Sequence, residues 1–375
     1  MTTRASGAKT SIKFAQEREW KQPFTEEQPM GNVYSINYRS VGLGGSKNQF
    51  QSETINDKRA VLGLGEGNKA VEGDIVTDFQ PEGQEIFWRH LLGKEADEDT
   101  DKTGLERTTI SAPETTDVDH EFDGYSKLTM KGAANTHQGL VIQKAFTSIE
   151  EFYVYPGCRV NTMTLNIIQE GFHDINWNII GTSEDIQDTD FFAGKVPSEV
   201  TDSGFTGYQA TLEVKKGAHK FMGDDVAADT DWVKLGFVTQ GNITITNDIE
   251  TDGYVIGSDV RESAEHGVRN CSGSWTMFYH NSEIYQLYQQ GVESAIRFVF
   301  DNHDPDPNKR KVIRITFPAV KFGGESAPIE SAQGGNLDLT FQAKYDQTSG
   351  TDVIVEFINK TPTALESEKY EAPAS

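Results

Sequence analysis

The sequence has only two cysteines, Cys158 and Cys271, in 375 residues. Two distant thiols exclude a disulfide scaffold and a zinc ribbon, because both need several cysteines at short spacing. No apolar run approaches the ~20 residues of a membrane helix, and the N-terminal segment shows no apolar stretch of a signal peptide. We therefore expect two buried free thiols and no membrane partner.

Basic residues are also scarce. Lys and Arg number 34 against 58 Asp and Glu, which gives a formal net charge of −24. Stable docking onto nucleic acid or an anionic membrane needs basic patches, so the composition argues against both. The hydrophobic fraction of 36%, with 35 glycines, approaches globular usage. The length then suggests two folded domains, or one with large insertions.

Short alternating apolar runs, broken by Gly, Asn and Asp, predict a mainly β protein. In the first half they cover 33–38, 127–131, 140–146, 152–155, 162–168 and 175–180. In the second they cover 208–214, 233–239, 242–247, 254–256, 272–279, 296–300, 312–317, 337–345 and 352–358.

Two segments have helical periodicity instead. Residues 85–93 place Ile86, Phe87, His90 and Leu91 on one face, and a glycine ends the segment. Residues 283–291 repeat the pattern. We expect two short helices, each lying on a sheet, with His90 as a core histidine.

Polar stretches set the expected domain boundaries. We predict tandem β-sandwich or barrel-type domains, separated and flanked by polar segments. From the N-terminus to the C-terminus we expect five parts: an arm at 1–32 that orders only against a partner, β domain 1 at 33–182 with an exposed acidic loop at 94–123, a linker or long excursion at 183–231, β domain 2 at 232–360, and a loose tail at 361–375.

The two helical segments have matching surroundings. A strand at 73–79 precedes the first and a strand at 273–278 precedes the second. Both segments open with Glu-Ile-aromatic and close at a glycine eight residues later. This shared order predicts two copies of one β-sandwich-plus-helix unit. Two unrelated β domains, or a single large one, remain the alternatives.

Motifs that carry chemistry are missing. The glycine-rich stretches 42–46 and 63–69 do not fit a phosphate-binding loop. The run 301–306 fails the calcium-loop pattern, because Asp306 stands where the loop needs glycine, and we expect a hairpin there. The histidines have no zinc spacing, and no nucleophile elbow is present. We expect no enzyme, no cofactor, and no catalytic, cofactor-binding or metal-binding residues.

One family does share the sequence's features. The sequence resembles the major tail tube proteins of long-tailed, non-contractile (siphovirus-type) bacteriophages, in a duplicated two-domain form. The resemblance covers about two thirds of the chain and lies in residues 52–55, 71–75, 156–162, 241–249, 253–258, Gly267, Gly273 and 278–291.

The resemblance implies a structural virion protein without enzymatic activity. Its inner strands would join those of neighbours into a barrel around a channel. Trimeric pseudo-hexameric rings, or hexameric ones, would stack helically into the tail tube, and double-stranded DNA would pass through the lumen without specific binding. The implied partners are further copies of the chain and the tail terminator, tape measure and tail-tip proteins. Assembly would take place in the host cytoplasm.

Physical chemistry adds three expectations. Pairing between chains satisfies the backbone groups of open strand edges. An acidic or neutral lumen keeps phosphates off the wall. The segment 39–70 is a candidate for a long hairpin that reaches the next ring. Alternative functions are a capsid decoration or baseplate β protein, a carbohydrate-binding β-sandwich using tryptophans 88, 177, 232 and 275, and a carboxylate-pair hydrolase.

Overall fold

The computed structural model describes residues 7–17, 20–21, 33–54, 60–61, 63–93, 107–110, 122, 124–133, 139–195, 197, 202–215, 232–279, 285, 288–289, 291–324 and 335–360. The described strands form a nineteen-stranded sheet in which every strand pairing is antiparallel. The predicted mainly β fold is confirmed. None of the described helices is long and apolar enough to cross a membrane.

The elements of the first half are η1 (Gly7–Lys9), β1 (Thr10–Gln16), β2 (Tyr34–Ser35), β3 (Ser40–Val41), β4 (Gly44–Gln51), β5 (Leu64–Asp78), α1 (Glu85–Leu92), β6 (Arg107–Thr109), β7 (Ser126–Lys131), β8 (Leu140–Phe146), β9 (Glu151–Ile167), β10 (Asp174–Gly181) and β11 (Asp185–Gln187). Those of the second half are η3 (Gly207–Gln209), β12 (Ala210–Lys215), β13 (Trp232–Leu235), β14 (Val238–Thr246), β15 (Asn270–Phe278), β16 (Ser294–Asp301), β17 (Lys311–Gly324), β18 (Asn336–Ala343) and β19 (Ile354–Asn359).

The same strand pairings occur in both halves. In the N-terminal strand set, defined as β1–β5 and β8–β11, β1 pairs with β2 and β8, β9 pairs with β8, β10 and β11, and β5 pairs with β4 and β10. In the C-terminal strand set, β12–β19, β12 pairs with β13 and β16, β17 pairs with β16, β18 and β19, and β15 pairs with β14 and β18.

The correspondence extends to single residues. A Cβ on Gly73 would lie 2.3 Å from the carbonyl oxygen of Gly42, and one on Gly273 would lie 2.3 Å from that of Asn242. Each of these positions differs from its counterpart by 200 in residue number. The β8–β9 register also shifts after Leu140, and the β16–β17 register shifts after Ser294, at the equivalent point. The two strand sets therefore share pairing, close approaches and irregularities.

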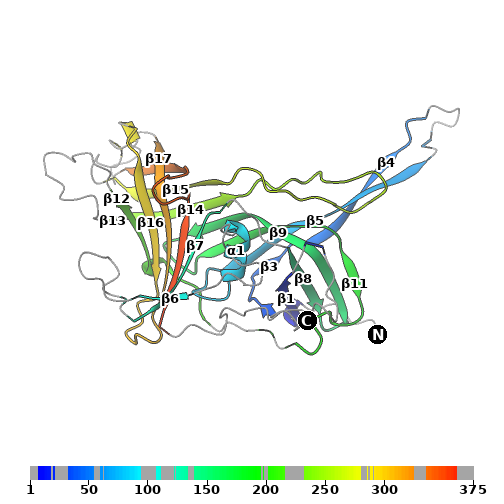
Figure 1. The fold of residues 1–375 in the computed structure, drawn as a ribbon, viewed down its shortest axis with the longest axis horizontal. Coiled ribbons are helices and arrows are strands. Elements are labelled where there is room, and N and C mark those ends of the chain that lie inside the picture. The colour runs from blue at the N-terminus through cyan, green and yellow to red at the C-terminus, as the bar shows by residue number, and fades with distance from the viewer. Residues whose placement is uncertain are drawn as a thin grey trace, which may run out of the picture.

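The first predicted helix is confirmed as α1. Gly93 ends it with φ of 85°, and its N–H donates to the Arg89 carbonyl. Every residue of α1 is buried, so the helix does not have the exposed face we expected. The reason is that β7 packs on α1 while pairing with β19 of the C-terminal set (Figure 1). Most of the second predicted helix lies outside the described residues.

Several segments differ from the sequence predictions. Residues 10–16, expected in a polar arm, form β1, with Ile12 and Phe14 fully buried. The strand predicted at 208–214, inside the expected linker, is confirmed as β12, but it pairs with β16 and so belongs to the C-terminal set. The predicted strand at 254–256 is a turn region. The acidic loop and the C-terminal tail lie largely or wholly outside the described residues.

The two strands expected at 152–155 and 162–168 are one strand, β9. Pro156 lacks an N–H and Gly157 has φ of 62°, which normally interrupt a strand. They fall where β9 changes partners. Up to Cys158, β9 pairs with β8 and β11, and from Arg159 onward it pairs with β10 and β14. The strand thus joins two layers, and the irregular residues form the corner.

The main core is continuous across both strand sets. Around α1, Phe87 stacks on Trp177 at 5.4 Å between ring centroids, and Phe14 lies 4.7 Å from Phe87. Cys158 and Cys271 are free and buried, as expected. Burial raises the pKa of both thiols, which keeps them protonated and unreactive.

Candidate assembly surface

The two strand sets meet through backbone pairing. The C-terminal half of β9 pairs with β14, with Thr162 opposite Thr246 and Ile167 opposite Gly241. The hydroxyls of Thr162 and Thr246 lie 3.3 Å apart. This contact, the internal joint, makes one sheet that runs β4–β5–β10–β9–β14–β15–β18–β17.

One face of this sheet carries the core and the other is polar. On β14, Ile243 and Ile245 are buried, whereas their neighbours Asn242 and Thr244 are not. The same alternation on β10, β15 and β18 makes the polar face a surface of Asn, Thr, Ser, Gln and Asp. Such a surface needs no covering partner in water.

Cross-strand hydrogen bonds organise the polar face. The Asn178 amide donates to Asp74 at 2.8 Å, and the Asn166 amide donates to Asp174 at 2.8 Å. The Thr276 hydroxyl donates to Asp338 at 2.6 Å. These bonds hold the carboxylates in place and orient neighbouring strands.

The charge of this face is acidic. Its uncovered strand positions carry the carboxylates Asp74, Asp78, Asp174 and Asp338, and the base Lys321. Arg39, which precedes β3, adds a second positive charge through its ion pair with Asp78. Four acids against two bases leave a modest negative excess among the described residues.

A long connection reinforces the internal joint. Residues 247–269, between β14 and β15, cross onto the N-terminal set, where Arg261 is buried and donates to the Gly181 carbonyl at 2.7 Å. Its guanidinium also pairs with Glu72. Further out, the ammonium of Lys69 pairs with Asp259 at 2.8 Å. The two sets are therefore bound by side chains as well as by the sheet.

Two strand edges in this sheet have no strand partner among the described residues. β4 pairs with β5 on one side only, and the second half of β17, after Val320, pairs with β18 on one side only. The N–H of Gly45 on β4 donates instead to the Glu184 carboxylate at 3.0 Å. An unpaired edge is a site for pairing with another chain.

The hairpin expected within 39–70 is confirmed as β4–β5. It extends away from the body of the molecule (Figure 1). Its side chains are largely exposed, including Phe50 and Leu64. The Phe50 ring lies over Gly65 and Gly67, where a Cβ would meet the ring at 3.1 and 2.8 Å. The glycines thus make room for an aromatic side chain in an otherwise open arm.

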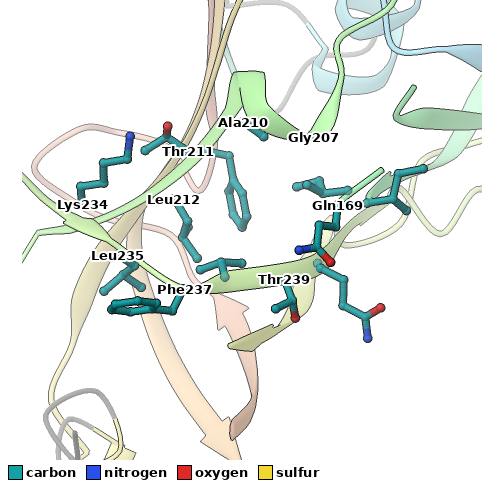
Figure 2. Close-up of a pocket in the computed structure, with 16 residues that line it drawn as sticks. Gln169, Gly207, Ala210, Thr211, Leu212, Lys234, Leu235, Phe237 and Thr239 are labelled. Atoms are coloured by element: carbon teal, nitrogen blue, oxygen red, sulfur yellow. The ribbon is translucent and has the colours of Figure 1, made fainter. Parts of the chain in front are cut away.

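A pocket of about 220 Å³ lies beside the internal joint, between β12, β13 and the end of β9. Figure 2 shows Leu212 directed into it, and Lys234 directed away. Ile167 and Phe298 also line it. No set of titratable groups converges among these lining residues, so the pocket offers packing space rather than chemistry.

The described residues hold no group of three His, Cys, Asp or Glu side chains able to bind a metal ion. The run 301–306 forms the expected hairpin between β16 and β17. Its first carboxylate, Asp301, pairs with Arg310, and the Asn302 carbonyl group of the side chain accepts from the Lys311 N–H. The loop's oxygens are thus used within the loop.

The described residues thus form an antiparallel sheet with one polar face and two edges that no described strand pairs with, an arrangement suited to assembly with further chains. Comparison with protein families identifies the class. The chain belongs to the phage tail tube protein family, whose model matches residues 7–343. It is therefore a structural protein of the virion tail, from a family that self-assembles into the tail tube. No curated protein matches the sequence.

The resemblance to tail tube proteins is thereby confirmed. Sequence reasoning missed the internal joint, because strand pairing between distant segments leaves no local signal. It also missed the Gly45–Glu184 contact, which joins residues far apart in the chain. The strand predicted at 242–247 is confirmed as part of β14, and that strand is the one that forms the joint.

Proposed function

We propose that three copies of this chain close a pseudo-sixfold ring by repeating the internal joint between molecules. One observation carries the proposal. The joint pairs β14 with β9, and the counterparts of these strands, β4 and β17, each have an edge that no described strand occupies. The free β4 of one chain would pair with the free β17 edge of the next, so that each chain contributes two duplicated tube domains.

The matching strand sets define the register of that contact. Equivalent residues of β4 and β14 differ by 200 in residue number. Toward the C-terminal ends of β9 and β17, equivalent residues differ by 161, so Met163 corresponds to Gly324. Within the chain, Thr246 lies opposite Thr162. Between chains, Ser46 would therefore lie opposite Gly323.

The backbone direction also fits. In the internal joint the N–H of Asn247 donates to the carbonyl of Asn161 at 2.8 Å, so alternate residues of β14 point toward β9. The residue two before Asn247 is Ile245, the counterpart of Gly45. The Gly45 N–H points away from β5 to Glu184, as pairing with a new strand requires.

The polar face would line the channel of the ring. Its Asn, Thr and Ser side chains carry no apolar patch, and its excess of carboxylates disfavours contact with phosphates. With a Debye length of ~8 Å at physiological salt, that repulsion acts only close to the wall. Double-stranded DNA would pass without specific binding.

Rings would stack into the tail tube through the β4–β5 hairpin, which extends beyond the sheet (Figure 1). Its exposed Phe50 supplies an apolar contact for the next ring. Tail terminator, tape measure and tail-tip proteins would complete the tail, with assembly in the host cytoplasm. A capsid decoration or baseplate role would instead give discrete particles.

Electron microscopy and cysteine pairing test the proposal together. Concentrated protein should form hollow tubes. Ser46→Cys with Gly323→Cys should give disulfide-linked chains on a non-reducing gel, since directly opposed strand positions lie within disulfide reach. The added Gly323 Cβ would meet only the rotatable Thr340 hydroxyl. Thr162→Cys with Thr246→Cys is the matched control and should link within one chain.

The outcomes separate the alternatives. Hollow tubes with links between chains support the ring. Monomers or discrete particles under tube-forming conditions would refute it. Tubes in which only the control pair forms a disulfide would mean that the chains meet by a different edge.

A further inference from the structure

Beside the internal joint, one aromatic side chain fastens the two strand sets. Phe79 follows β5 in the N-terminal set and is fully buried. Its ring lies 4.8 Å from that of Phe300, edge-on, and 5.5 Å from that of Phe205, both from the C-terminal half. Its N–H donates to the His173 carbonyl at 2.9 Å. The C-terminal half of the chain therefore covers the Phe79 side chain.

Tyr279 occupies the same position in the C-terminal set. It follows β15, and its N–H donates to the Gly335 carbonyl at 3.0 Å, as Phe79 donates to His173. Phe79 and Tyr279 differ by 200 in residue number, the offset between equivalent residues of β5 and β15. Their acceptors, His173 and Gly335, differ by 162, which is also the offset between the equivalent residues Cys158 on β9 and Val320 on β17. Yet Tyr279 is 46% exposed. The position that is buried at the internal joint is open here.

The surface that covers Phe79 also has a counterpart. Phe300 on β16 lies opposite Ala210, and Phe146 on β8 lies opposite Thr10, so the two phenylalanines are equivalent. The Phe146 ring lies 5.7 Å from that of Tyr153, edge-on. We call this pair the aromatic platform. Both rings are only partly buried.

We propose that Tyr279 of one chain docks on the aromatic platform of a second copy. The inference rests on the proposed ring, and it names the side-chain contact that accompanies strand pairing. Edge-on aromatic pairs contribute beyond their buried area. A tyrosine suits a surface that is exposed before assembly and buried afterwards, because its hydroxyl stays hydrated while the ring supplies apolar area.

The contact also explains why the two positions differ in residue type. Phe79 is covered as the chain folds and never faces water, so a wholly apolar ring fits. Tyr279 faces water in every free chain. Its neighbour Phe278 is 52% exposed, so this end of β15 presents an apolar patch that a second molecule could bury.

Photo-crosslinking on assembled tubes tests the proposal. A benzoyl-phenylalanine photo-crosslinker placed at Tyr279 should link to the peptide that carries Phe146 and Tyr153, in a different chain. Mixing isotope-labelled and unlabelled chains shows by mass spectrometry that the link is between molecules. The reverse placement, at Phe146, should link to the peptide that carries Tyr279. The same group at Ile256, an exposed residue of the connection 247–269, is the control and should not link to the platform.

The results distinguish this inference from the ring proposal. Tubes whose crosslinks map to the platform from either position support it. Tubes whose crosslinks map elsewhere from both positions overturn the docking contact and leave the ring intact. Failure of the unmodified chain to form tubes overturns both. In addition, Tyr279→Ala should raise the concentration needed for assembly by roughly tenfold or more, whereas Tyr279→Phe should leave it within about twofold.

Discussion

The internal joint and the two open edges are built from equivalent strands, which are paired at the joint and lack a described partner at the edges. Where β9 meets β14, the backbone is paired, Phe79 is buried and the connection 247–269 lies across the contact. At the corresponding places on β17 and β4, the edge has no described strand partner, Tyr279 is exposed and a carboxylate occupies the Gly45 N–H. The comparison shows what a second molecule would have to supply.

The largest expected effect comes from proline at equivalent positions on the two edges. Ile245→Pro removes a ladder donor from the internal joint and places a ring in the core, and should destabilise the fold by more than about 3 kcal/mol. Gly45→Pro changes only an edge strand, where proline is tolerated. It removes the hydrogen bond to Glu184 and brings a Cβ to within 3.0 Å of that side chain, so it should lower the melting temperature by about a few degrees and abolish tubes. Calorimetry and negative-stain microscopy measure the two effects. Normal tubes from Gly45→Pro would contradict the equivalence.

An acid-dependent loss of stability should follow, and it should belong to the internal joint. Burial lowers the pKa of His173 to about 4, whereas the unfolded chain binds that proton near pH 6.5. Because the unfolded state then binds more protons, stability falls as pH drops from 6.5 to 4, by about 2–3 kcal/mol for this group.

Thermal unfolding across that pH range measures the loss. His173→Gln should flatten part of the pH dependence while it lowers stability at neutral pH. An unchanged slope in that variant would assign the acid sensitivity to other groups. The counterpart residue is Gly335, so the contact between chains should lack this sensitivity.

Glu184 should affect assembly rate more than stability. Its carboxylate accepts a hydrogen bond from the Gly45 N–H, a donor that pairing with β17 needs. Glu184→Ala should free the edge and shorten the lag of polymerisation severalfold, as followed by light scattering. Glu184→Gln keeps a hydrogen-bond acceptor, so its lag should lie between those of the unmodified protein and Glu184→Ala. A longer lag in Glu184→Ala would mean that the carboxylate helps assembly.

The smallest effect should come from one hydroxyl at the joint. Thr246→Ala loses the contact with the Thr162 hydroxyl and should cost about 0.5–1 kcal/mol of stability in the free chain. Ser46→Ala, the counterpart, should change the stability of the free chain by less than that. Equal losses in both variants would argue against different roles for the two positions.

Much of the fold follows from local pattern. Alternation located most of the strands, and the helix at 85–92 followed from its periodicity and the glycine that ends it. Pairing partners did not follow, because a strand carries no local mark of which distant strand it will join. Pro156 and Gly157 lie between the runs expected as separate strands at 152–155 and 162–168. They interrupt strands in general, but here they lie at a corner where the partners change.

The candidate assembly surface was harder to predict. The hairpin within 39–70 could be found from its glycines, and the polar face from alternating Asn and Thr. Residues 10–16 were misjudged because their flanks are polar, although Ile12 and Phe14 complete the core. Tyr279 could not be singled out from the sequence, because its equivalence to Phe79 depends on the pairing of distant strands.

Because β9 and β14 belong to one polypeptide, their contact forms without any dependence on protein concentration. Tethering gives the two strand sets a high effective concentration for each other, whereas β4 and β17 must find partners by diffusion. Half of the contacts around a closed ring would thus be made during folding, and dilution would affect only the other half.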